Sequence, residues 1–202
     1  MNEQEQFWEN SFGDNYISRN NSSELISSNI SFFLNALKRC DNINSIVEFG
    51  PNIGMNLRAL NISLPKANLH GVEINAKAAK ILEETKIATV TNCSIKEFEI
   101  EKSFDLSFTK GVLIHINPND LILTYNKIFE SSNKYILIAE YFNDVPSEIN
   151  YRGFKEKLFK RDFAGEFLDL FPSTKLIDYG FVYKRDPMYP LDNISWFLIE
   201  KY

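Results

Sequence analysis

The chain has 202 residues, of which 44% are hydrophobic and 24% charged, and its formal net charge at pH 7 is −5. This length suits one domain, and the hydrophobic content is sufficient for a buried core. A net negative chain does not attract polyanions, which disfavours a nucleic-acid partner. The two cysteines, Cys40 and Cys93, lie outside any metal-ligand spacing and the chain has only two histidines, so we expect no metal site.

The sequence shows no signal peptide and no membrane span. Its N-terminus is polar and acidic, and no apolar run approaches the roughly 20 residues that cross a bilayer. We therefore expect a cytoplasmic protein with reduced cysteines and no membrane partner. No repeat or low-complexity linker divides the chain, so residues 1–202 are expected to form a single domain.

Two helical segments are expected before residue 40. Phe7, Trp8 and Phe12 are spaced to line one side of a short helix, and residues 13–15 read as a turn. A longer helix follows, with Ser23 as its expected N-cap and apolar residues at helical spacing up to residue 37.

From residue 45 the pattern changes to strands alternating with helices. Strands are expected at 45–49, 68–74, 87–91, 104–109 and 135–140, and helices at 55–60, 76–84 and 120–130. This alternation predicts an α/β fold with a mainly parallel sheet and helices on both faces. A helix over 160–171 precedes two strands, 175–184 and 194–201, which predict an antiparallel C-terminal hairpin because no helix separates them.

The turn after the first strand is the strongest single motif. It runs from Glu48 to Gly54 and opens a helix, the position where open α/β sheets bind nucleotides. Gly50 permits a sharp turn, and Gly54 allows a ligand to approach the helix N-terminus. The dinucleotide fingerprint G-x-G-x-x-G does not fit, because Asn52 and Met55 occupy its second and third glycine positions. A nicotinamide-dependent oxidoreductase is therefore disfavoured.

A second feature supports nucleotide binding. Glu73 ends the second expected strand, where a carboxylate can accept hydrogen bonds from both hydroxyls of a ribose. The fourth expected strand begins with Phe104-Asp105-Leu106. The acidic residue followed by a G-x-x-x-G turn resembles motif I of the S-adenosylmethionine (SAM)-dependent methyltransferases, and Phe-Asp-Leu occurs at the same point in that family.

This resemblance implies the Rossmann-like class I methyltransferase fold, a seven-stranded sheet, with SAM as cofactor and S-adenosylhomocysteine (SAH) as product. In the family the acidic residue, here Glu48, stands near the amino end of the methionine moiety. Residues 1–22 would cap the cofactor pocket, with Arg19 paired to the methionine carboxylate. The cofactor-binding residues so implied are Tyr16, Arg19, Glu48, Gly50, Asn52, Gly54, Glu73, Ile74, Cys93, Ser94, Ile95, Lys110 and Gly111.

A narrower resemblance rests on several stretches. They are Phe7-Trp8, Phe12-Gly13-Asp14-Asn15-Tyr16, Arg19-Asn20, the run from Thr109 to Pro118, Ile138 to Asn143, Tyr151-Arg152-Gly153, Leu158 to Glu166, and Asp178 to Phe181. Together they resemble the methyltransferases associated with pseudaminic acid and related nonulosonic acid biosynthesis in bacteria. The resemblance covers nearly the whole chain and implies an acidic sugar acceptor, or its nucleotide-activated form or precursor, methylated at an amino or hydroxyl group.

Methyl transfer from a sulfonium depends mainly on alignment, and a general base is needed only if the acceptor must lose a proton. His115 is the first candidate base, because it lies just past the fourth strand. Glu140 and Tyr141 end the fifth strand at the same edge and are candidates to orient the acceptor. Candidate acceptor-binding residues are Tyr151, Arg152, Lys160, Arg161, Tyr183 and Arg185.

Other functions stay open at this point. One is a methyltransferase for protein or RNA, which the acidic composition disfavours. Another is a SAM-binding sensor or pathway scaffold without transferase activity, since no indispensable catalytic residue marks the motif. The chain is expected to be a monomer, or a homodimer through an exposed edge of the terminal strands.

Overall fold

The computed structural model describes residues 1–17, 22–154 and 157–202. A seven-stranded sheet with the strand order β3-β2-β1-β4-β5-β9-β8 forms its centre. All neighbours are parallel except β9, which is antiparallel to both β5 and β8. The strands are β1 (Ser45–Phe49), β2 (Asn68–Glu73), β3 (Thr89–Asn92), β4 (Phe104–Lys110), β5 (Ser132–Glu140), β8 (Thr174–Val182) and β9 (Ile194–Lys201). The predicted sheet with its antiparallel C-terminal hairpin is confirmed.

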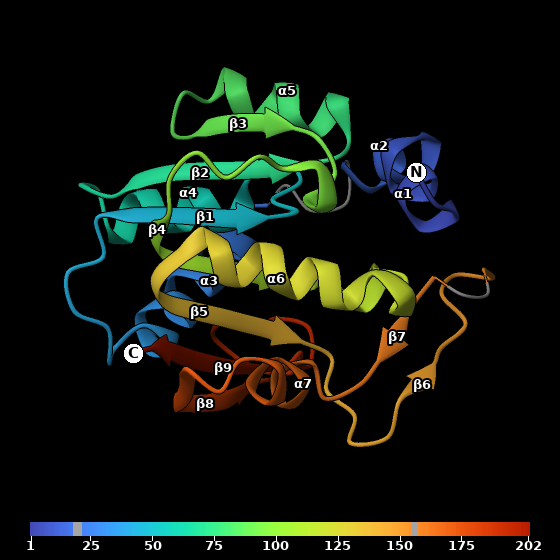
Figure 1. Ribbon diagram of the computed structural model, residues 1–202. Helices are drawn as coiled ribbons and strands as arrows, with labels where there is room; N and C mark the ends of the chain where they lie inside the picture. The colour runs from blue at the N-terminus through green and yellow to red at the C-terminus, as the bar shows by residue number, and fades with distance from the viewer. Residues whose placement is uncertain (18–21, 155–156) are drawn as a thin grey trace.

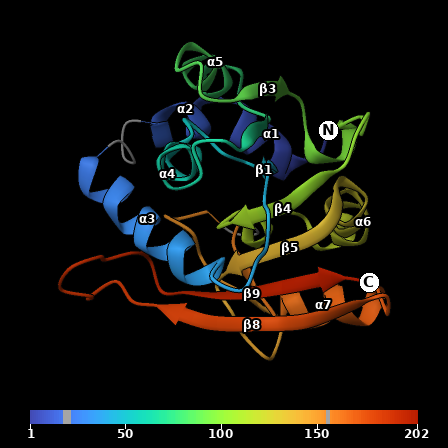
Figure 2. The same cartoon turned by 90° about the vertical axis from the view of Figure 1, so that its left-hand side faces the viewer.

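Helices cover both faces of this sheet (Figures 1 and 2). One face packs against α3 (Ser23–Ala36), α4 (Met55–Ser63) and α5 (Ala76–Glu84), and the other against α6 (Leu121–Ser131) and α7 (Phe163–Leu170). Each face therefore has its own apolar core. In the described part of the chain, no helix is both long and apolar enough to cross a bilayer.

Two short helices, α1 (Glu3–Glu9) and α2 (Ser11–Ile17), lie beyond the carboxyl ends of the parallel strands, on the side to which the arrowheads of β1 and β2 point (Figure 1). A two-stranded ribbon, β6 (Ser147–Glu148) and β7 (Phe159–Lys160), lies at the same end. The chain goes from β1 to β2 on one side and returns to β4 on the other, so β1 and β4 form the switch point where open α/β sheets bind ligands.

The structure corrects three local expectations. Residues 13–15 lie inside α2 rather than in a turn. The N-cap of α3 is Ser22, whose Oγ accepts a hydrogen bond from the Leu25 N–H at 3.2 Å, rather than Ser23. The last helix starts at residue 163 instead of 160, because Phe159–Lys160 pairs with β6 and Asp162 then caps the helix.

Gly54 gives a test of the packing between α4 and α5. Its φ is +83°, and an added Cβ would lie 2.3 Å from Leu82 Cδ1. We expect Gly54→Ala to lower the free energy of unfolding by about 2–4 kcal/mol, through strain in the left-handed region plus overpacking. The matched control is Gly111→Ala, with φ +70° but nothing within 4 Å of an added Cβ, which should cost only the strain of about 1–2 kcal/mol. Urea denaturation measures both, and equal losses would contradict the close contact.

Candidate functional site

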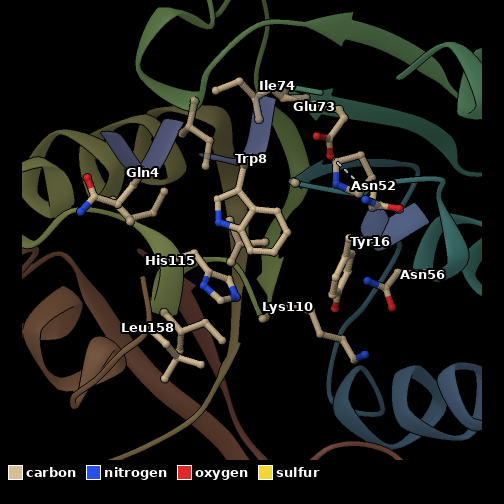
Figure 3. A pocket seen from close by; sticks show the side chains of 18 of the residues that line it. Gln4, Trp8, Tyr16, Asn52, Asn56, Glu73, Ile74, Lys110, His115 and Leu158 are labelled. Carbon is tan, nitrogen blue, oxygen red and sulfur yellow. Dashed lines mark hydrogen bonds between the residues drawn. The ribbon is translucent and has the colours of Figure 1, made fainter. Parts of the chain in front are cut away.

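A cavity of about 720 Å³ opens at the carboxyl ends of the parallel strands. Its walls come from the loops that follow β1 to β5, from α1 to α3, and from the segment that joins β8 to β9. Figure 3 shows that Trp8 lies in the middle of this cavity, with the His115 ring beside it and Glu73 across from both. This is the place and the size expected for a small-molecule or cofactor site.

The turn after β1 forms one wall. Gly50 has φ +73°, and an added Cβ would lie 2.7 Å from Val112 Cγ2, so only glycine fits there without a shift. Asn52 stands where many glycine-rich loops have a second glycine, and its φ of +51° is in the left-handed region that asparagine tolerates. The Asn52 backbone N–H donates to Glu73 Oε2 at 2.7 Å (Figure 3). Asparagine therefore keeps the backbone shape of the turn.

Glu73 is the central acceptor of the cavity wall. It is 5% exposed, and its Oε1 accepts a second hydrogen bond from the Asn75 backbone N–H at 2.8 Å. Burial raises the pKa of this carboxyl, while the backbone N–H groups of Asn75, Asn52 and Ile74 lower it. Each carboxylate oxygen still has a free lone pair, so Glu73 can accept further hydrogen bonds from neighbouring hydroxyls of a ligand.

Glu48 lies behind the cavity wall rather than on it. Its Oε1 accepts a hydrogen bond from Asn56 Nδ2 at 2.6 Å, and its buried Oε2 has no hydrogen-bond partner among the described residues. Burial raises the pKa of Glu48 to about 8. Asn56 itself lines the cavity, so Glu48 acts on that wall through the Asn56 amide.

Lys110 ends β4 and lines the same part of the cavity (Figure 3). Its ammonium group forms no ion pair within 4.0 Å with any described residue, although Glu48 and Asp192 attract it. Burial lowers its pKa. Lys110 is thus held at the cavity wall, where an anionic group of a ligand would favour its charged form.

The end of β3 supplies another wall through Cys93, Ser94 and Ile95, which face the cavity together with Ile74. The Ser94 hydroxyl caps the short helix η1 (Ile95–Glu97) and donates to a Glu97 carboxylate oxygen at 3.0 Å. Burial raises the pKa of the Cys93 thiol, which therefore stays neutral. This wall therefore offers a ligand backbone groups and apolar surface, and not the polar side chains of Cys93 and Ser94.

His115 lies in the cavity wall between two aromatic rings. Its ring centroid is 4.6 Å from that of Trp8 and 5.0 Å from that of Tyr151. Its Nδ1 lies 2.6 Å from the Lys157 carbonyl oxygen, which only accepts, so the ring proton is on Nδ1 and Nε2 keeps a lone pair. Burial lowers the pKa of His115 to about 4. The ring is therefore neutral at pH 7.

Glu140 was expected to orient the acceptor, but it does not line the cavity. It is buried outside the cavity wall, and its Oε1 accepts hydrogen bonds from the backbone N–H groups of Val112 and Leu113, both at 3.0 Å. Burial raises its pKa to about 7. Since these N–H groups belong to the loop that carries His115, Glu140 positions that loop.

The next residue, Tyr141, does line the cavity. Its hydroxyl is hydrogen-bonded to Asp192, a cavity residue from the segment between β8 and β9. Burial raises the pKa of Tyr141, and the Asp192 carboxylate raises it further.

The structure brings together only part of the expected acceptor-binding set. Tyr151 and Arg152 line the cavity, but four other residues do not: Lys160, Arg161, Tyr183 and Arg185. The Arg161 Nε donates to Glu166 Oε1 at 2.5 Å, and the Lys160 ammonium lies 5.4 Å from the centre of the Tyr141 ring. Tyr183 and Arg185 are exposed, whereas Lys184 between them lines the cavity.

Among the expected cofactor-binding residues, the cavity wall contains ten: Tyr16, Gly50, Asn52, Glu73, Ile74, Cys93, Ser94, Ile95, Lys110 and Gly111. Glu48 and Gly54 lie outside it, and Gly54 makes room for Leu82 instead of a ligand. Arg19 lies outside the described residues. The polar or aromatic wall residues that were not identified from the sequence include Trp8, Asn29, Asn56, Lys184 and Asp192.

A scan against models of known protein families finds no match, and a search of curated proteins finds none either. Solved structures do match over nearly the whole chain. Magnesium protoporphyrin IX methyltransferase from Synechocystis PCC 6803, solved with SAH, is 9% identical with a TM-score of 0.70, and the match covers 98% of each chain.

Two further structures give the same picture. The 1,6-didemethyltoxoflavin-N1-methyltransferase of Burkholderia thailandensis, solved with that compound and SAH, is 14% identical with a TM-score of 0.69, covering 98% of this chain and 86% of the other. The plantazolicin methyltransferase BpumL, in complex with SAH, is 16% identical with a TM-score of 0.65, covering 98% and 93%. The chain therefore has the Rossmann-like fold of class I SAM-dependent methyltransferases.

The His115 geometry predicts a definite NMR signature. We expect long-range ¹H–¹⁵N spectra to show His115 as the neutral Nδ1–H tautomer at pH 7 and half-protonated only near its pKa of about 4. A His70→Gln variant assigns the signals, because the chain has two histidines. An Nε2–H tautomer would contradict the hydrogen bond to Lys157, and titration at pH 6.5 or above would contradict the burial of the ring.

Proposed function

We propose that this protein is a SAM-dependent methyltransferase that acts on a small, acidic acceptor. The single observation that carries the proposal is the Glu73 carboxylate, fixed by two backbone N–H groups at the wall of a cavity at the switch point of a methyltransferase fold. A carboxylate in this position has the acceptors needed for both hydroxyls of a ribose.

The residues present fit the cofactor on several counts. Gly50 keeps the turn after β1 free of side-chain bulk toward Val112, and the backbone N–H of the left-handed Asn52 holds Glu73 in place. Lys110 and the Asn56 amide both line the cavity, and the buried Glu48 carboxyl behind the wall holds that amide in place, so this wall offers polar groups to the amino-acid moiety of the cofactor.

Bound SAM would supply an electrophilic methyl group on a sulfonium. Glu73 would accept hydrogen bonds from the ribose, and the backbone around Ser94 and Ile95 would contact the adenine. Lys110 and Tyr16 would bind the methionine end, with Glu48 acting through Asn56. Residues 1–22 would cap the cofactor, since Trp8 and Tyr16 come from α1 and α2 and line the cavity.

The charges of the wall support an acidic acceptor. Three basic residues, Lys110, Arg152 and Lys184, line the cavity, and the carboxylate of Asp192, which attracts Lys110, is already hydrogen-bonded to Tyr141. These basic side chains line the cavity of a chain whose net charge is −5, and they favour an anionic group on the acceptor. A nonulosonic acid, or its nucleotide-activated form or precursor, has this chemistry and offers amino and hydroxyl groups for methylation.

His115 would accept the proton that such a group loses. Its Nδ1–H is held by the Lys157 carbonyl, so the lone pair is on Nε2, and Glu140 fixes the loop that carries the ring. Trp8 and Tyr151 pack against the ring and keep it neutral. A neutral imidazole can take up a proton as methyl transfer proceeds.

Calorimetric titration with SAH tests the cofactor assignment. We expect wild-type protein to bind SAH and Glu73→Ala to bind it at least about tenfold more weakly, because the hydrogen bonds to the ribose are lost. Glu84→Ala, at the exposed end of α5, is the control and should bind like wild type. Failure of the wild type to bind SAH or SAM would contradict the methyltransferase proposal.

A further inference from the structure

Asn75 stands between the Glu73 carboxylate and the two N-terminal helices. It is 2% exposed, and its backbone N–H donates to Glu73 Oε1 at 2.8 Å. Its Oδ1 accepts the Ala78 N–H at 2.8 Å and so caps α5. These two bonds fix the residue firmly to the sheet and leave its Nδ2 group for other partners.

All of the Nδ2 contacts of Asn75 go to α1 and α2. Nδ2 lies 3.2 Å from the Trp8 carbonyl oxygen, 3.0 Å from the Glu9 carbonyl oxygen and 3.1 Å from Asp14 Oδ1. Gly13 makes this junction possible, since an added Cβ would lie 1.9 Å from the Trp8 oxygen and 2.8 Å from Nδ2. One side-chain amide therefore joins both helices to the loop that carries the ribose-binding carboxylate.

The two helices bury few side chains of their own. In α1 only Gln4 is buried, and the segment is held by polar contacts, such as Lys96 to Glu5 at 3.1 Å, and by ring contacts, such as that of the half-buried Phe7 with Phe154. In α2, Ile17 is half-buried against an apolar cluster of α4 and α5. Segments of this kind open at a low free energy without unfolding the core. Opening would remove Trp8 from the cavity and from its contact with His115.

We propose that Asn75 couples ligand binding at Glu73 to closure of α1 and α2 over the cavity. This inference rests on the proposed function, because the group that meets Glu73 is the ribose of the cofactor. A ligand that contacts both Glu73 and Trp8 has more contacts in the closed form, so it binds that form more tightly. By linkage, any loss of the closing hydrogen bonds lowers its affinity.

Asn75→Asp is the sharpest test. Aspartate keeps the acceptor that caps α5 and the backbone N–H to Glu73, but it replaces the donor by an oxygen that faces two carbonyls and Asp14. We expect SAH affinity to fall about tenfold. Hydrogen exchange of amides 3–17 at saturating SAH should be at least about fivefold faster than in wild type. A merely structural role would lower the Tm and leave SAH-dependent protection unchanged.

Gly13→Ala provides a second route, because it blocks the junction without altering any polar group. Like Asn75→Asp, it should lower the affinity for SAH and speed up the exchange of amides 3–17 at saturating SAH. Asn92→Asp is the matched control: its Nδ2 donates to the Glu73 and Ile74 carbonyls of the same loop and touches neither N-terminal helix. Exchange of amides 3–17 should match wild type in this control.

The outcomes separate the two proposals. If wild-type protein fails to bind SAH, the proposed function and the coupling both fall. If wild type binds SAH while Asn75→Asp and Gly13→Ala show the same affinity and the same protection of amides 3–17, the coupling alone is overturned.

Discussion

The Glu73 carboxylate is held at the end of β2 by one backbone N–H from the turn after β1 and one from the start of α5. A buried carboxylate loses much of its hydration, and such donors are what restore its charged form. The two loops must therefore be in place before Glu73 can offer its remaining lone pairs to a ligand. The left-handed Asn52, the cap at Asn75 and the position of α1 and α2 all follow from this arrangement.

The electrostatics of the cavity depend on which charges face it. Glu48 and Glu140 are buried behind the wall, where one holds the Asn56 amide and the other holds the loop before His115. Burial raises the pKa of Glu48 to about 8 and that of Glu140 to about 7, and neither carboxyl lines the cavity. The cations Lys110 and Lys184 reach the cavity itself.

Much of the fold could be predicted from the sequence because its signals are local. Apolar periodicity located the strands, and the Gly50 turn with Glu73 located the cavity, since both follow strands whose carboxyl ends must meet at one edge. The directions of individual side chains could not be predicted in this way. Arg161 donates a hydrogen bond to Glu166 instead of lining the cavity, and Lys184 lines the cavity whereas Tyr183 and Arg185 do not. These directions depend on how distant segments pack against each other.

Contacts between segments that are far apart in the chain could not be predicted from the sequence for the same reason. Nothing in the local pattern of Asn75 shows that its amide meets the Trp8 carbonyl, which is 67 positions earlier in the chain. Gly13 is the one local sign of this contact in the sequence, because only a glycine fits where the two N-terminal helices meet Asn75. The local pattern predicts a turn at Gly13, but the glycine lies inside α2, where the close packing against Trp8 and Asn75 leaves no room for a side chain.

The most direct test of the central claim compares SAH with its 2′-deoxyribose analogue by calorimetry, on wild-type protein and on Glu73→Ala. If Glu73 binds the ribose, the analogue binds wild type about tenfold more weakly than SAH, and Glu73→Ala removes most of that difference. Equal affinities of wild type for the two ligands would contradict the assignment of Glu73 as the ribose-binding carboxylate.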